Sequence, residues 1–153
     1  MTSTPLAVTR VEGRSPMLIC ALIIILALSV GVGLVSHTIL HHIVQTLPLW
    51  VVVFLGRRPA AKWFGVPCFV FWLVIMVLIW LFLLHLPSPL HGHFSPMEIT
   101  MTIVVGVASV IALASAALLR GVRPGSAAVA FLLGAAAQYA CFWISKIPAI
   151  WNH

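Results

Sequence analysis

Five long runs of apolar residues, separated by short breaks rich in proline, glycine and arginine, make up most of the chain. Each run is close to the ~20 apolar residues that a helix needs to cross a bilayer. Lys and Arg lie between the runs or at their ends. The pattern predicts an all-α integral membrane helical bundle with about five transmembrane helices and short loops. The helices are expected at about 17-35, 37-55, 61-86, 96-119 and 126-147.

The breaks carry residues that end or begin helices. The segment 56–59 places Gly and Pro around two arginines, and the segment 87–89 ends the third run with two prolines. The segment 95–98 matches a capping box, in which Ser95 caps the fourth helix and Glu98 reaches back to the Ser95 amide. These signals are local, so they predict helix ends without knowledge of the fold.

The division between the first two runs is the least marked. A single helix over 17–55 would be nearly ~60 Å long, about twice the hydrocarbon thickness of a bilayer. Two helices joined by a tight turn, with Ser36 capping the second, fit the same pattern within one bilayer. We therefore expect 1-16 to be an N-terminal tail, 17-150 to form a single transmembrane bundle, and 151-153 to be the C-terminal end.

Composition excludes a soluble domain. Apolar residues account for 63% of the chain and charged residues for only 7%, whereas soluble domains carry about 25% charged residues. Because there are too few charges to cover a water-exposed fold, the outer surface must face lipid. The basic patches are too small for a nucleic-acid footprint, so the expected partner is the lipid bilayer and not a nucleic acid.

Positive charges alternate between the segments that join the runs. The N-terminal tail and the second and fourth connections contain Lys or Arg, whereas the connections after the first and third runs contain neither. The positive-inside rule therefore predicts a cytoplasmic N-terminus and a C-terminus outside. This alternation, together with the lack of a transit peptide, fits a bacterial inner (plasma) membrane.

In this topology all seven histidines of the chain gather at the outer face. His37 and His41 are four residues apart, so on a helix they would share one face and could chelate an ion. Imidazole suits zinc and copper, nearby Met97 and Met101 would favour Cu(I), and histidines from two helices could enclose a haem. The candidate metal ligands, all near outer helix ends or in the outer loop, are His37, His41, His42, His85, His91 and His93.

A second interpretation of the histidines requires no ligand. Histidine is amphipathic and tolerates the headgroup region, where it can lie as Trp and Tyr do. The spacing lacks a signature as specific as HExxH, and Glu98 is explained by its capping role. Metal or haem binding and simple interfacial packing both remain open from the sequence.

Polar residues within the apolar runs predict a third class of protein, a small transporter or an ion- or proton-conducting protein. Such groups are costly inside a bilayer and often mark a path. The candidates for a polar path are Gln45, Gln138 and Tyr139. No charged residue lies near the middle of a run, however, and glutamines also form hydrogen bonds between helices.

Enzymatic motifs are missing from the sequence. The chain has no aspartate, no nucleophile elbow and no phosphate-binding loop, and its three cysteines form no CxxC pair. The sequence therefore favours a protein that is not an enzyme. The remaining interpretation is a structural, accessory or assembly subunit, acting as a homo-oligomer or within a larger membrane complex, with the small residues of the fourth run as a packing surface.

Overall fold

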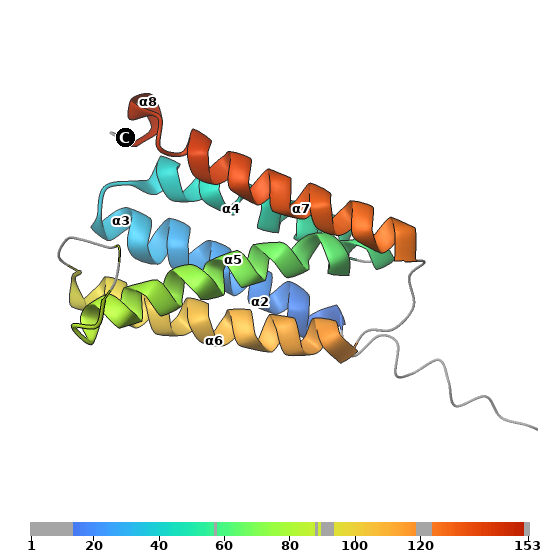
Figure 1. The fold of residues 1–153 in the computed structure, drawn as a ribbon. Helices are drawn as coiled ribbons and strands as arrows, with labels where there is room; N and C mark the ends of the chain where they lie inside the picture. The colour runs from blue at the N-terminus through green and yellow to red at the C-terminus, as the bar shows by residue number, and fades with distance from the viewer. Residues whose placement is uncertain (1–13, 57, 88, 90–93, 119–123, 152–153) are drawn as a thin grey trace, which may run out of the picture.

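The computed structural model describes residues 14–56, 58–87, 89, 94–118 and 124–151 (Figure 1). This part of the chain is helical and contains no strand, which confirms the predicted all-α membrane bundle. The elements in chain order are α2 (Arg14–Leu26), η1 (Ala27–Val32), α3 (Gly33–Val35), α4 (Ile39–Leu55), α5 (Pro59–Leu83), α6 (Pro96–Leu118), α7 (Pro124–Ile144) and α8 (Pro148–Trp151).

Four of the described helices are long and apolar enough to cross a membrane: Pro16–Val35, Ala60–Leu83, Pro96–Leu118 and Pro124–Ile144. The remaining predicted span, the second, corresponds to α4, which has 17 residues and is about 25 Å long, shorter than the ~30 Å hydrocarbon core. Figure 1 nevertheless shows α4 running across the bundle beside the other helices. The expected set of five is therefore four long helices and one short helix.

The helices lie side by side and run alternately up and down the bundle (Figure 1). Helix α6 packs on α2 and α5, while α7 packs on α5 and α4. The interior is closed by buried apolar side chains from four helices, including Ile24, Leu49, Phe69 and Val105. Large apolar side chains such as Phe54 cover the outside, as expected for a surface that faces lipid.

Small residues allow the helices to approach closely. On α6, Ala108, Ala112 and Ala116 are buried within the bundle, so these small residues pack against the chain's own helices. On α7, Gly134 lies against the backbone of α5: a Cβ placed there would be 2.9 Å from the carbonyl carbon of Phe64. The contact between α5 and α7 therefore depends on the missing side chain.

The first long helix is continuous from Arg14 to Val35 but changes geometry within it. Residues Ala27–Val32 form a π-helical stretch, in which hydrogen bonds join residues five apart instead of four; such stretches are often found at functional sites. The amide of Gly33 donates to the carbonyl of Leu28 at the end of this stretch. Leu28 and Val32, both in this stretch, line a cavity between the helices.

Two helices end at a histidine in the left-handed conformation. His37 has φ 55° and His85 has φ 56°. After each, an amide donates back to the carbonyl five residues earlier, from Thr38 to Gly33 at 3.0 Å and from Leu86 to Leu81 at 2.9 Å. This is the hydrogen-bond pattern of a Schellman motif, which normally has glycine at the left-handed position.

These motifs explain where the structure departs from the predicted helix ends. The second helix begins at Ile39 and not at residue 37, because His37 belongs to the turn that ends α3. The third ends at Leu83 and not at residue 86. The fourth begins at Pro96 as predicted, and its capping box is formed: the Ser95 amide donates to Glu98 Oε2 at 2.7 Å, and the Glu98 amide donates to Ser95 Oγ at 3.2 Å.

Candidate functional site

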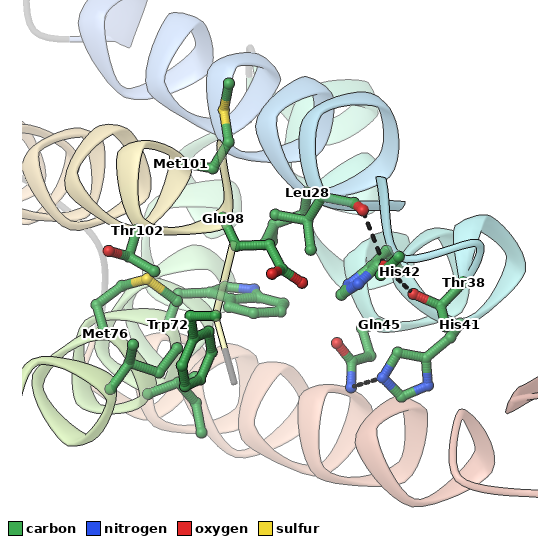
Figure 2. A pocket seen from close by; sticks show the side chains of 15 residues that line it. Leu28, Thr38, His41, His42, Gln45, Trp72, Met76, Glu98, Met101 and Thr102 are labelled. Atoms are coloured by element: carbon green, nitrogen blue, oxygen red, sulfur yellow. Dashed lines mark hydrogen bonds between the residues drawn. The ribbon is translucent and has the colours of Figure 1, made fainter. Parts of the chain in front are cut away.

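A cavity of about 480 Å³ opens at the end of the bundle where α4 and α6 begin (Figure 2). Its walls come from the first long helix, α4, α5 and α6, so it lies between the helices. Most of its lining is apolar. The lining residues with polar side-chain atoms are Ser36, Thr38, His41, His42, Gln45, Trp72, Glu98 and Thr102.

His41 joins the start of α4 to the end of α7. The His41 Nδ1 atom lies 2.8 Å from the carbonyl oxygen of Ser145, and Gln45 Nε2 lies 3.0 Å from His41 Nε2. An amide nitrogen only donates and a carbonyl oxygen only accepts. His41 is therefore a neutral imidazole with its proton on Nδ1, and both of its ring nitrogens have protein partners.

His42 differs from its neighbour. Its ring stands edge-on to that of His41, with centroids 5.1 Å apart. The Nδ1 atom of His42 is buried and has no hydrogen-bond partner among the described residues. Figure 2 shows the His42 side chain facing the cavity, so the unpaired nitrogen is available to a molecule bound there.

Trp72, on the opposite wall, also has an unpaired polar atom. It is only 3% exposed, and its Nε1 is buried with no hydrogen-bond partner in the part of the chain that the structure describes. Most buried polar atoms in proteins are hydrogen-bonded, so an exception calls for an explanation. Here two exceptions, His42 and Trp72, line one cavity.

Glu98 brings a carboxylate to the same space. The capping box holds this side chain at the first turn of α6, and in Figure 2 the carboxylate projects into the cavity. It interacts electrostatically with His42. The predicted capping role and a place in the cavity wall are therefore compatible, because a carboxylate has two oxygens and several acceptor positions.

The predicted metal ligands do not form a group of three in the part of the chain that the structure describes, although the rings of His41 and His42 are neighbours. His37 and His41 do not share a helical face, because α4 begins at Ile39, and His37 and His85 are exposed residues that close α3 and α5. His91 and His93 lie outside the described residues. Within the described residues, no three side chains of His, Cys, Asp or Glu are grouped so that they could hold a metal ion.

The predicted polar path divides into two parts. Gln138 is buried and its Nε2 donates to the backbone carbonyl of Gln45 at 3.2 Å, which joins α7 to α4. This carbonyl lies in the turn before Pro48, whose ring disrupts the helix hydrogen bonds. Tyr139 is 63% exposed and points away from the bundle. The two glutamines thus form an interhelical link.

Trp72 was not identifiable from the sequence. It is one of several aromatic residues in the third apolar run, and nothing in its spacing distinguishes it from the others. Its role depends on its position opposite His42 and Glu98, which only the packed bundle reveals. No family model, no curated protein and no solved structure matches this chain.

Proposed function

We propose that this protein binds a small amphipathic molecule taken up from the membrane, in the cavity between α4, α5 and α6. The observation that carries this proposal is the pair of buried, unpaired nitrogens, His42 Nδ1 and Trp72 Nε1, which line one cavity. A concave and mainly apolar site with a few convergent polar groups is the usual form of a small-molecule site.

The energetic argument concerns the two nitrogens. Leaving a buried donor or acceptor unsatisfied costs about 1–3 kcal/mol. A ligand with polar atoms at one end would satisfy both groups, and its apolar part would occupy the rest of the cavity. Under the positive-inside rule the cavity faces the outer side of the membrane, where a molecule with a polar head and an apolar body would lie at the same depth.

A soft metal ion is the second candidate. His42, Met76 and Met101 line the same cavity, and imidazole with thioether sulfur is a donor set that suits Cu(I). This candidate retains the copper prediction but moves it from the His37–His41 pair to His42.

The test is to purify the protein in mild detergent and analyse what it carries. Organic extracts are examined by mass spectrometry, metals by elemental analysis, and haem by visible absorption. Trp72→Phe removes one unpaired nitrogen and keeps an aromatic ring. Trp63→Phe is the matched control, because Trp63 Nε1 is also buried and unpaired but does not line the cavity.

We expect a lipophilic molecule to be retained near one per protein by the wild type and by Trp63→Phe, and about fivefold less by Trp72→Phe. Equal retention by all three proteins contradicts the proposal, as does the absence of any retained molecule together with no thermal stabilisation by added amphiphiles. Near-stoichiometric copper that is lost in His42→Leu would support the metal candidate instead.

A further inference from the structure

We propose that the ligand is a neutral, oxygen-bearing ring on a hydrocarbon tail, the chemistry of a membrane quinone or quinol. The ring lies in the cavity, and the tail lies in an apolar groove between α5 and α6 on the outside of the bundle. This inference rests on the proposed function and specifies its ligand class. It is supported by the unpaired nitrogens of His42 and Trp72 and by the Glu98 carboxylate in the cavity. It is also supported by Met76, which lines both the cavity and the groove.

The headgroup follows from three side chains. Trp72 Nε1–H only donates, so the ligand must present an acceptor oxygen to it. His42 Nδ1, from a different wall, needs a second polar atom. The Glu98 carboxylate in the same cavity disfavours a carboxylate or phosphate head by charge repulsion. A protonated amine would suit Glu98 but has no lone pair to accept from Trp72. We therefore infer a neutral head with two oxygens.

A quinone ring satisfies these conditions in both of its redox forms. Its two carbonyl oxygens lie on opposite sides of a rigid ring and can accept from groups on opposite walls. In the quinol, each hydroxyl both donates and accepts, so one can donate to Glu98 while its oxygen accepts from His42 Nδ1–H, and the other accepts from Trp72. The binding site therefore requires no change of its own when the ligand changes form.

The tail has a separate site. A groove of about 420 Å³ lies between α5 and α6, and apart from the Trp80 indole nitrogen its lining side chains are hydrocarbon or thioether. Several of them, including Val77, Val107 and Val110, are exposed, so the groove faces lipid. Met76 lines both this groove and the cavity. Because methionine has three rotatable bonds, this side chain is suited to let a tail pass between the two spaces.

Gly106 leaves the α6 side of the groove without a side chain beside Met76. A Cβ placed there would meet only Met76, with its Cβ at 3.8 Å, so the glycine is not needed for close helix packing. Trp80 Nε1 donates to Thr102 Oγ1 at 3.0 Å one turn away, which holds α5 to α6 beside the opening. The contact between α5 and α6 is thus held by the Trp80–Thr102 hydrogen bond, and one turn further along α6, at Gly106, no side chain fills the space.

The experiment titrates the full-length protein in detergent with decylubiquinone, and measures binding by isothermal calorimetry. Decanoate has a similar tail with an anionic head and serves as the competing probe, and decanol supplies a neutral head with one oxygen. We expect saturable one-to-one binding of decylubiquinone, with decanoate about tenfold weaker or more. Trp72→Phe and His42→Leu should each weaken decylubiquinone about tenfold, while Trp63→Phe should not.

Two further variants test the charge and the tail separately. Glu98→Gln keeps the capping box and removes the charge, so it should strengthen decanoate binding and reduce the preference for decylubiquinone over decanoate. Gly106→Leu should fill the groove and abolish the advantage of decylubiquinone over a ubiquinone with one isoprenoid unit. Val70→Leu, also on the exposed surface of α5 but outside both spaces, should preserve it.

The outcomes separate the ligand class from the proposed function. If decanol or decanoate binds in a Trp72-dependent manner and decylubiquinone does not, the quinone assignment is wrong and amphiphile binding stands. If the cavity variants bind every probe as the wild type does, both proposals are wrong. If Trp72→Phe does not fold, Glu98→Gln decides: no gain in decanoate affinity overturns the headgroup assignment.

Discussion

Gly134 is the residue at which α7 comes closest to the backbone of α5. A side chain there would overlap the carbonyl group of Phe64, and Cys68 Sγ lies 3.8 Å from the Gly134 carbonyl oxygen across the same contact. Backbone atoms cannot move aside as the end of a flexible side chain can. The missing Cβ of Gly134 therefore determines how closely α5 and α7 pack. One hydrogen bond, from Gln138 Nε2 to the Gln45 carbonyl, likewise joins α7 to α4.

We expect Gly134→Ala to destabilise the protein by about 1–3 kcal/mol, because an extra methyl group in a close helix contact forces the helices apart. Thermal unfolding in detergent, followed by circular dichroism, measures the effect. The matched control is Gly125→Ala on the same helix, where nothing lies within 4 Å of the added Cβ. Equal unfolding temperatures for the two variants would show that the α5–α7 contact is not as close as described.

We expect Gln138→Leu to lower the free energy of unfolding by about 1 kcal/mol, because it removes the hydrogen bond to the Gln45 carbonyl. Tyr139→Phe, on the exposed side of the same helix, should leave stability unchanged. Proton and ion flux into liposomes is measured for the same variants. A specific flux that disappears in Gln138→Leu while stability is retained would favour a conducting path over an interhelical link.

The ends of the helices determine what the histidines do at the scale of elements. His37 and His85 both occupy the left-handed position that closes a helix, and His41 ties α4 to the residue after α7. Of the histidines that the structure describes, this leaves His42 with an unpaired nitrogen facing a cavity. His37 and His85, which the sequence suggested as metal ligands, are thus explained by their positions at the ends of α3 and α5.

We expect His85→Gly to stabilise the protein by about 1 kcal/mol, because glycine adopts the left-handed conformation without the steric cost that a Cβ imposes. His85→Ala keeps that cost and serves as the control, with no gain expected. Unfolding temperature measures both variants. If His85→Gly is instead less stable than the wild type, the imidazole has a role beyond ending α5.

The whole molecule is organised by helices that cross it alternately. The Arg14 end of α2 and the C-terminal helix α8 lie at opposite ends of the bundle in Figure 1. An odd number of crossings produces this arrangement, and it requires α4 to cross despite its 17 residues. A short span can be accommodated by local thinning of the bilayer at modest cost. The charge alternation would then place the end that carries the cavity outside.

Reporter fusions test this topology. We expect a reporter that is active only in the cytoplasm to work at the N-terminus, and one that is active only outside to work at the C-terminus. Reversing the two fusions gives the internal control. Both termini on the same side of the membrane would mean that α4 does not cross, and the proposed position of the cavity at the outer surface would have to be abandoned.

The sequence by itself determined the class of protein and several of its helix ends. Hydropathy is a property of continuous segments, and the capping box of residues 95–98 needs only near neighbours. Only the tertiary structure decided which polar groups meet. His41 and Ser145 are 104 residues apart, and Trp72 faces His42 and Glu98 from a third helix. Such contacts depend on how the helices pack and rotate, which a single membrane sequence does not specify, because an apolar face can turn toward lipid or toward protein.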